Sequence, residues 1–282
     1  MVVVGVGLIG GSIGLGLLDS AFAESVIGYD PDPVSLSTAV SHRCVSIATG
    51  SLDDVSLADM VVLASPPETI PQLLRDLEPI IGPQTVITDT CSVKGVIMDA
   101  VPESLRSRFV GGHPMAGREL GGVKYSRKDL FDGSSWILCP FPETDQDAYL
   151  WVQRMVYALD ARPVRLSPKE HDEHVALLSH LPHVLANELL AMASELRKPD
   201  IHGGSWSDLT RVGGSNPALW EQIFSMNSEA LQGTLGTLIE RLEAAKKMLA
   251  EGNTAGLREI IEKAETARYR AVTPQLHQVN SE

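Results

Sequence analysis

Cysteine is scarce in this sequence, with three among 282 residues. Cys44, Cys91 and Cys139 are odd in number and lie far apart, whereas a disulfide framework or a zinc site requires other spacings. Because this usage fits a reducing compartment, we expect a cytoplasmic protein.

Positive charge is also limited. The chain has 23 Lys and Arg against 36 Asp and Glu, which gives a formal net charge of −13. The few basic clusters, such as Arg106/Arg108 and Lys246-Lys247, are short and interrupted by other residues. An acidic chain without a strong basic patch repels nucleic acid and anionic membranes, so we expect neither as a partner. An anionic substrate would need a few specific cations to hold it.

Long apolar runs are missing after residue 18, so we expect no membrane-spanning segment there. Residues 1–18 are apolar and precede Ala21-Phe22-Ala23, which resembles a signal-peptidase site. A secretory signal does not fit, because no Lys or Arg precedes Arg43 and the run contains six glycines. Internal repeats and low-complexity stretches are absent too, which excludes solenoid, fibrous and disordered classes.

The first part of the chain alternates short apolar runs with helical patterns. This alternation is typical of βαβ units in a parallel sheet with helices on both faces. Strands are expected at Val2–Val6, Val26–Tyr29, Val45–Ala48, Met60–Ala64, Thr85–Thr88, Phe109–Gly111, Trp136–Leu138 and Val164–Leu166. Helices are expected at Ile9–Leu18, Pro67–Ile81, Val93–Leu105 and Asp145–Leu159.

The first strand and helix are joined by Gly5-Val6-Gly7-Leu8-Ile9-Gly10, which matches G-x-G-x-x-G. The first glycine allows a tight turn, the second lets the backbone approach a pyrophosphate, and the third lets the helix pack on the strand. Asp30 ends the second strand 25 residues after Gly5, near the roughly 20 expected for a ribose-binding acid. Since a carboxylate repels a 2′-phosphate, we predict NAD rather than NADP. Asp32, between two prolines, is the alternative acid but is more typical of a turn.

After Leu166 the pattern becomes wholly helical. Ser167-Pro168 combines an N-cap residue with proline at the first helical position. Helices are expected at Val175–Leu196, Ala218–Leu249 and Ala255–Tyr269. We therefore predict an α/β fold with an N-terminal Rossmann-type dinucleotide-binding domain, residues 1–166, and a C-terminal all-helical domain, residues 167–282. The helical domain is expected to bind substrate and to form a homodimer.

Three loops follow strands at the carboxyl edge of the sheet, where Rossmann-type folds bind ligands. They are Ser65-Pro66-Pro67, Asp89–Lys94 and Gly112–Gly117. We expect Ser65 to contact the cofactor. His113 lies on the third loop, and its imidazole can take a proton from a hydroxyl while hydride leaves the same carbon. The alternative is a histidine that only hydrogen-bonds its loop.

The second loop offers further candidates. The Ser92 hydroxyl could bond a substrate oxygen or orient His113, or it could cap a helix that starts at Val93. Lys94 could contact a phosphate or carboxylate, or lie on the surface, and Cys91 is expected to pack.

Five motifs lie in order along nearly the whole chain. They are Gly-Leu-Ile-Gly-Gly-Ser at 7–12, Asp89-x-x-Ser92-Val-Lys94, Gly-Gly-His-Pro-Met-Ala-Gly at 111–117, Ser-His-Leu-Pro-His at 179–183, and Thr-Arg-Val-Gly-Gly-Ser-Asn-Pro at 210–217. Together they resemble the prephenate/arogenate dehydrogenase family of tyrosine biosynthesis.

The resemblance implies NAD(P)-dependent oxidative decarboxylation, of prephenate to 4-hydroxyphenylpyruvate or of arogenate to tyrosine. His113 would accept or hydrogen-bond the hydroxyl proton. Arg211 would grip a substrate carboxylate, for which a guanidinium offers two parallel hydrogen bonds. His183 would contact the substrate side chain, and His180 would be a structural or active-site histidine. Trp220 could line the pocket or simply pack.

His180 and His183 lie three residues apart, so they share one face of a helix. Pro182 leaves a carbonyl near residue 178 without its partner, which predicts a kink. His171 and His174 form a second pair that faces another way by α-helical geometry, unless the kink reorients it. We therefore expect no metal site.

Two other functions remain open at this point. A β-hydroxyacid dehydrogenase would carry a catalytic lysine on the long interdomain helix, but residues 169–195 contain only Lys169. A non-catalytic NAD-binding protein would bind cofactor without turnover. The sequence does not separate prephenate from arogenate, which differ in one keto or amino group. We expect no appended regulatory domain, although direct competition by tyrosine at the active site is compatible with the sequence.

Overall fold

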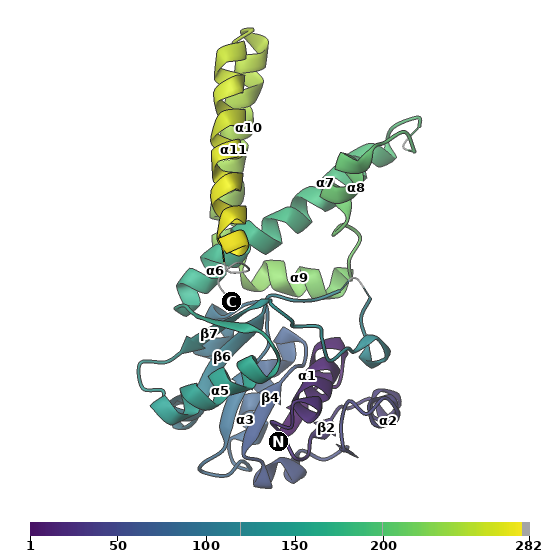
Figure 1. Cartoon of the computed structure of the whole chain (residues 1–282), viewed down its shortest axis with the longest axis vertical. Coiled ribbons are helices and arrows are strands. Elements are labelled where there is room, and N and C mark those ends of the chain that lie inside the picture. Colours follow the sequence, from purple (N-terminus) through teal and green to yellow (C-terminus); the bar gives the residue numbers. More distant parts are fainter. Residues whose placement is uncertain (119, 199, 278–282) are drawn as a thin grey trace. The chain divides into compact units, whose positions relative to one another are not determined.

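The structure is a computed structural model that describes residues 1–118, 120–198 and 200–277 (Figure 1). The chain forms two compact units, Met1–Leu231 and a second unit that begins at Gln232. The first unit holds the sheet and all the candidate site residues.

The first unit is built on an eight-stranded sheet with the strand order β3-β2-β1-β4-β5-β6-β7-β8. Neighbouring strands are parallel except β6 and β7, which pair antiparallel. The strands are β1 Val2–Val4, β2 Ile27–Tyr29, β3 Ile47–Thr49, β4 Met60–Leu63, β5 Val86–Asp89, β6 Phe109–Pro114, β7 Ser135–Pro140 and β8 Arg162–Arg165. Each expected strand is present, with ends shifted by a few residues, and the predicted Rossmann-type α/β fold is confirmed.

Helices cover both faces of the sheet. They are α1 Leu8–Asp19, α2 Pro33–Ser41, α3 Ile70–Leu77, α4 Gly95–Asp99 and α5 Gln146–Ala158, with 3₁₀ turns at Leu52–Leu57, Pro67–Thr69, Glu103–Arg108 and Val123–Tyr125. Strand β1 shows why its residues are all apolar: Val3 packs in one core with Ile13 of α1, whereas Val2 and Val4 pack in another with Leu74 of α3. A central parallel strand buries both faces, so alternation disappears.

Strand β6 departs from the sequence-based expectation. It continues to Pro114 and pairs with β7 through His113 and Ile137. His113 therefore lies in a buried strand, and its predicted position on a loop was wrong. Gly111 and Gly112 do not form a turn; a Cβ at Gly112 would overlap the backbone oxygen of Asp89, so they allow β6 to approach β5 closely.

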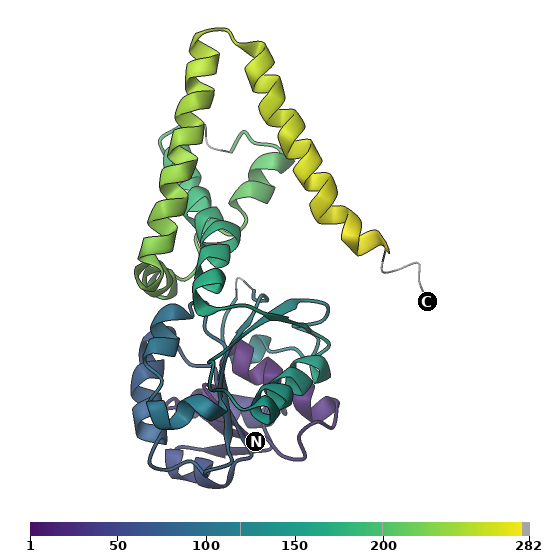
Figure 2. The ribbon, with the colours of Figure 1, turned by 90° about the vertical axis from the view of Figure 1, so that its left-hand side faces the viewer.

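The chain after Leu166 is helical, as predicted, with different breaks. The elements are α6 Pro168–Val175, a π-helical turn Ala176–His180, α7 Leu181–Ser194, α8 Gly204–Thr210, α9 Pro217–Met226, α10 Ser228–Ala250 and α11 Thr254–His277 (Figures 1 and 2). A capping box between Ser167 and Glu170 starts α6. The expected helix Ala218–Leu249 is instead divided at Asn227, the C-cap of α9.

The π-helical turn lies directly before Pro182. Proline has no amide hydrogen, so the carbonyls one turn earlier cannot form their usual bonds, and the wider turn occupies this stretch. The kink predicted from Pro182 is therefore present as a π-helical turn.

One continuous helical stretch, Pro168–Ser194, is long and apolar enough to cross a bilayer by length and composition. By that criterion the expectation that no run beyond residue 18 reaches this length was wrong. The stretch also carries His171 and His180, which are fully buried and contribute to the hydrogen-bonded site described below.

Candidate active site

The glycine loop leaves the first turn of α1 open. Gly5 has a φ of 94°, a conformation that favours glycine, and turns the chain from β1 into α1. Gly7 is the N-cap residue of α1, and no side chain forms a capping hydrogen bond there. A Cβ atom on Gly7 would meet no other atom within 4 Å. A Cβ on Gly10 would overlap the carbonyl oxygen of Gly5. The space beside Gly7 is therefore open, and the amides of Leu8, Ile9 and Gly10 bond no group among the described residues, a geometry that suits a phosphate.

Asp30 is held beside this loop at the end of β2. One carboxylate oxygen accepts the Val6 amide at 3.0 Å and the other accepts the Asp32 amide at 2.9 Å. Each oxygen keeps capacity for a further hydrogen bond. Asp32 instead caps α2 by accepting the amides of Val34 and Ser35, which agrees with the local turn role expected for it.

Ser65 lies at the end of β4, next to the glycine turn. Its hydroxyl donates to the Val4 carbonyl at 3.2 Å, and a Cβ on Gly5 would come within 2.7 Å of its oxygen. An open helix N-terminus, a glycine turn and an oriented carboxylate on β2 together fit a dinucleotide.

His113 belongs to a second cluster, on β6 and α6. Its side chain is buried, and its Nδ1 lies 2.7 Å from Nε2 of His171. His171 is fully buried, and its Nδ1 lies 2.7 Å from the carboxylate of Asp172. Burial, together with the nearby His171, Lys94 and His180, holds the pKa of His113 well below 6.5. The ring is therefore neutral at physiological pH and able to accept a proton.

Asp172 also fixes the loop that carries Ser92. Its two carboxylate oxygens accept the amides of Lys94 and Gly95, each at 2.8 Å. Helix α4 begins at Gly95 and its N-cap makes no side-chain bond. The alternative that Ser92 caps a helix starting at Val93 was therefore wrong, because Asp172 supplies that capping. Ser92 is half-buried, with its backbone beside the His180 ring.

Lys94 is not a surface residue. It is fully buried and forms a 2.5 Å ion pair with Asp89, which is also fully buried. Asp89 accepts the amides of Cys91 and Gly112 as well, at 2.9 Å each. The Gly112 bond links β5 to β6 next to His113, and the alternative that Lys94 lies on the surface was wrong. Cys91 is buried, as expected of a packing residue.

His180 joins the same network from the π-helical turn. Its Nδ1 lies 3.1 Å from the side-chain nitrogen of Asn227, which also donates to the backbone oxygen of Asp172 at 2.9 Å. Burial lowers the pKa of His180 to about 4, against the opposing charge of Asp172. The π-helical turn thus brings His171 and His180 to one side, where a regular α-helix would separate them.

His183, Trp220 and Arg211 form an adjoining group. The His183 ring stacks on Trp220 with centroids 3.4 Å apart and an interplanar angle of 26°. Burial lowers the pKa of His183 to about 4, and the charge of Arg211 contributes. Arg211 is exposed at the C-cap of α8. Trp220 also packs edge-on against His180, so it links the two groups.

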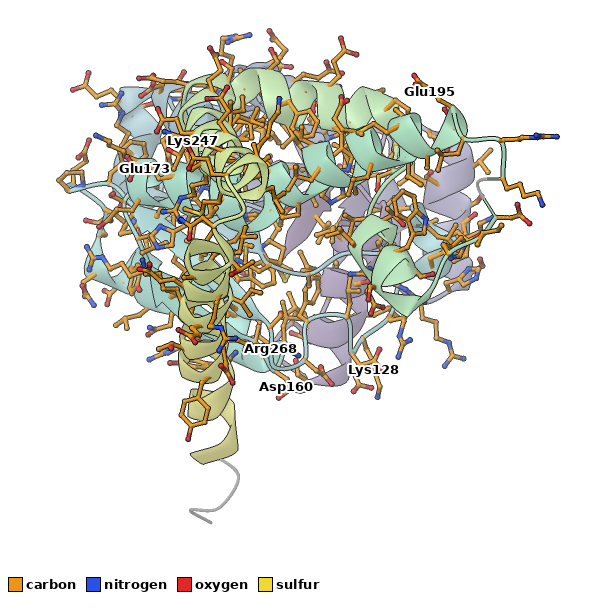
Figure 3. The ribbon with its side chains drawn as sticks, turned by 90° about the horizontal axis from the view of Figure 1, so that it is seen from above. Lys128, Asp160, Glu173, Glu195, Lys247 and Arg268 are labelled. Carbon is orange, nitrogen blue, oxygen red and sulfur yellow. The ribbon has the colours of Figure 1, made fainter. Side chains whose placement is uncertain are left out.

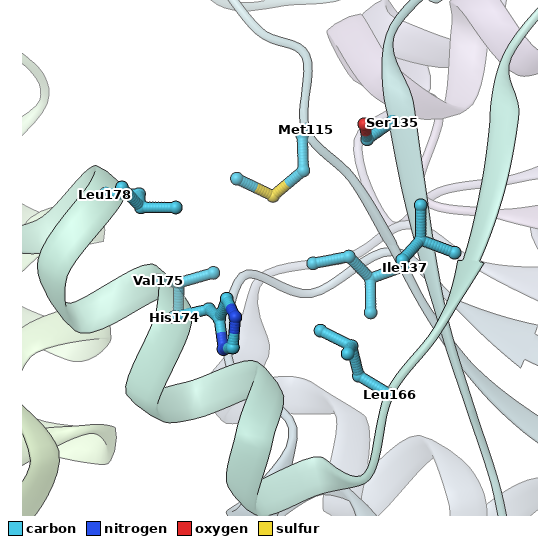
Figure 4. Close-up of a pocket in the computed structure, with 8 residues that line it drawn as sticks. Met115, Ser135, Ile137, Leu166, His174, Val175 and Leu178 are labelled. Atoms are coloured by element: carbon cyan, nitrogen blue, oxygen red, sulfur yellow. The ribbon is translucent and has the colours of Figure 1, made fainter. Parts of the chain in front are cut away.

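An apolar cavity of about 360 Å³ lies between β7, β8 and the helical stretch that begins with α6 (Figure 4). Met115, Ile137, Leu166, Val175 and Leu178 line it together with His174. His174 bonds only the backbone oxygen of Glu170 among the described residues, so it stands apart from His171.

Sequence reasoning missed His171, Asp172 and Asn227. Ser167 and Pro168 correctly predict where α6 begins. The side of the helix on which His171 lies relative to His180 depends on the π-helical turn, which helical periodicity does not show. Among the described residues, no group of three or more His, Cys, Asp or Glu side chains is placed to hold a metal ion.

The glycine loop, Ser65, the Ser92 loop and His113 lie on successive parallel strands, β1, β4, β5 and β6. Their carboxyl ends share one edge, so the sheet aligns a dinucleotide site with a buried, neutral histidine. This arrangement defines the class: a Rossmann-type nucleotide-binding protein with a helical second part.

Comparison with known proteins identifies the family. Residues 13–165 match the family described as "Prephenate dehydrogenase, nucleotide-binding domain", and residues 167–263 match "Prephenate dehydrogenase, dimerization domain". The chain belongs to the prephenate dehydrogenase family.

Individual relatives agree. The chain is 30% identical to prephenate dehydrogenase of Bacillus subtilis, over 90% of this chain and 71% of that protein. It is 31% identical to cyclohexadienyl dehydrogenase of Zymomonas mobilis, over 93% of this chain and 95% of that protein. The crystal structure of A. aeolicus prephenate dehydrogenase with hydroxyphenyl propionate and NAD⁺ superimposes with a TM-score of 0.88 at 32% identity, covering 96% of this chain and 97% of that one.

Proposed function

We propose that this protein is an NAD-dependent oxidoreductase that oxidatively decarboxylates prephenate to 4-hydroxyphenylpyruvate, a step of tyrosine biosynthesis. The family and the names of its relatives support the reaction. The observation that carries the proposal is His113, a buried neutral imidazole at the sheet edge that also bears the dinucleotide loop.

NAD is the cofactor, and when bound it supplies the hydride acceptor. Gly5, Gly7, Leu8, Ile9 and Gly10 receive the pyrophosphate at the start of α1. Asp30 bonds the adenosine ribose, and its negative charge disfavours NADP. Ser65 borders the same space.

His113 accepts the proton of the substrate hydroxyl while the carbon that bears it loses hydride. The bond from the ring to its carboxylate then breaks and CO2 leaves. Its electron pair enters the ring, the ring becomes aromatic, and the former hydroxyl oxygen takes the proton back from His113 to give the phenol. Ser92 hydrogen-bonds the substrate oxygen from the loop that Asp172 fixes. The protein's task is to position these groups and to stabilise the developing charge.

Prephenate is a dianion, and Arg211 binds one of its carboxylates. His183 contacts the substrate side chain, with its ring oriented by Trp220. His180 completes the pocket beside Ser92. Because the net charge is −13, these local groups must attract the substrate against the overall field.

Arogenate is the second candidate substrate, favoured by the likeness to a cyclohexadienyl dehydrogenase. Initial rates of cofactor reduction with prephenate and with arogenate, each with NAD and NADP, test the proposal. We expect prephenate with NAD to be the preferred pair. Absence of reduction with either substrate would overturn the function.

We also propose a cytoplasmic homodimer with a nucleotide-binding domain over 1–166 and a helical domain over 167–282. The two family segments, 13–165 and 167–263, support this division. Exposed apolar side chains on the helices support dimerisation, among them Met192, Ile239, Leu242 and Ile261.

A further inference from the structure

Three side chains form a continuous series of close polar contacts that ends at His113. The Asp172 carboxylate lies 2.7 Å from His171 Nδ1, and His171 Nε2 lies 2.7 Å from His113 Nδ1. Both rings are buried, and the backbone amides of Lys94 and Gly95 hold the carboxylate in place. The series therefore connects α6 and the start of α4 to β6.

The chemistry of Asp172 sets the direction of each hydrogen bond. A carboxylate can only accept, and hydrogen bonds from His171 and from the Gly95 and Lys94 amides outweigh burial and keep the pKa of Asp172 below its ordinary value. His171 must therefore donate through Nδ1–H, which leaves a lone pair on its Nε2. His113 must then donate through its own Nδ1–H. Its Nε2 carries the lone pair and hydrogen-bonds to none of the residues that the structure describes.

We propose that His171 and Asp172 are positioning residues that hold His113 in the Nδ1–H tautomer, so that Nε2 is the atom that takes the substrate proton. The inference rests on the proposed function, in which His113 is the base. When Nε2 gains the proton, the Asp172 charge stabilises the imidazolium through His171. Lys94 and His180 also face His113, and Asp89 balances the charge of Lys94.

The same logic operates in serine proteases, where an aspartate fixes the tautomer of the catalytic histidine. Replacing that aspartate by asparagine reverses the hydrogen bonds and costs about 10⁴-fold in turnover. Here an additional histidine lies between the carboxylate and the base.

Two pairs of variants test the series. In Asp172→Asn the charge is lost and one of the two oxygens that accept the Lys94 and Gly95 amides becomes a donor. The hold on His171 is therefore weakened, and we expect kcat to fall about 10²- to 10⁴-fold with KM changed only a few-fold. Glu173→Gln is the matched control, because Glu173 is the neighbouring acid, exposed on the same helix (Figure 3), and pairs only with Lys169 among the described residues. It should retain wild-type turnover.

The second pair changes His171. In His171→Leu the acceptor for His113 is lost, and kcat should fall about 10²-fold or more. In His171→Gln the carboxamide can accept from His113 and donate to Asp172, so it preserves the direction of both bonds and should recover part of the loss. If His171 had only a structural role, His171→Gln would not have a higher kcat than His171→Leu.

The tautomer itself can be observed without turnover. Nitrogen-15 NMR of the histidine rings should show His113 protonated at Nδ1 in the wild type, with a smaller Nδ1–H population in Asp172→Asn. A wild-type His113 protonated at Nε2, or equal kcat in Asp172→Asn and Glu173→Gln, would overturn the inference. A wild type with the Nδ1–H tautomer but no turnover of either substrate would instead contradict the proposed function.

Discussion

At the scale of single residues, burial decides the charge of the histidines in the site. His180 and His183 both have a pKa of about 4, chiefly because burial disfavours the charged ring. The sequence identifies both positions through the motif at 179–183. Their protonation state could not be predicted, because it depends on burial and, for His183, on the charge of Arg211, which comes from elsewhere in the chain.

This burial predicts a pH dependence of stability. In the unfolded chain these rings take up a proton near pH 6.5, whereas in the folded protein they stay neutral down to about 4. The unfolded state binds more protons below pH 6.5, so stability should decline as the pH falls from 6.5 toward 4. For His180 the shift corresponds to roughly 3 kcal/mol.

Urea unfolding at several pH values measures this effect. The variant His180→Gln should lose less stability across that window than the wild type does. Identical pH profiles for the two proteins would show that His180 is not held neutral by folding.

At the scale of elements, the glycine loop and the π-helical turn contrast in how well sequence reveals them. The loop is local, and the three backbone requirements at Gly5, Gly7 and Gly10 appear directly as a motif in the sequence. The π-helical turn follows from Pro182, but its consequence, the joining of His171 and His180, involves α6, α9 and the sheet together. Periodicity assumes a regular helix, in which His171 and His180 face different ways, and the structure instead follows the alternative that the kink reorients them.

Two glycine substitutions separate folding from cofactor binding in this loop. Gly7→Ala adds a methyl group that meets no protein atom within 4 Å, so the fold should keep its wild-type melting temperature. The methyl group occupies the space predicted for the pyrophosphate, and NAD affinity should fall at least about tenfold, which is about 1.4 kcal/mol.

Gly10→Ala is the comparison. Its methyl group would overlap the Gly5 carbonyl, so both melting temperature and NAD affinity should fall. Calorimetric titration with NAD and thermal unfolding distinguish the two. Unchanged NAD affinity in Gly7→Ala would contradict the assignment of this loop to the cofactor.

At the scale of the whole molecule, the order of strands and helices could be predicted from alternation and from the change of pattern at Leu166. The antiparallel pairing of β6 with β7 could not be predicted. It requires β6 to continue through Gly111 and Gly112, and two glycines in a row are equally typical of a turn. The ion pair of Lys94 and Asp89 was also unpredictable, because five residues of spacing do not reveal that both side chains turn into the core.

The oligomeric state is also predicted at the scale of the whole molecule. The exposed apolar residues on the helices predict a homodimer of a 30.4 kDa chain. Sedimentation equilibrium should give about twice the chain mass, and a monomer at micromolar concentration would contradict dimerisation.

The central claim is that the His113 site oxidises and decarboxylates prephenate with NAD. The most direct measurement is the product balance of a reaction with prephenate and NAD, in the wild type and in His113→Asn. We predict equal amounts of NADH, CO2 and 4-hydroxyphenylpyruvate from the wild type, and turnover reduced about 10²-fold or more in His113→Asn while NAD binding persists. NADH without CO2, or undiminished turnover in His113→Asn, would contradict the account.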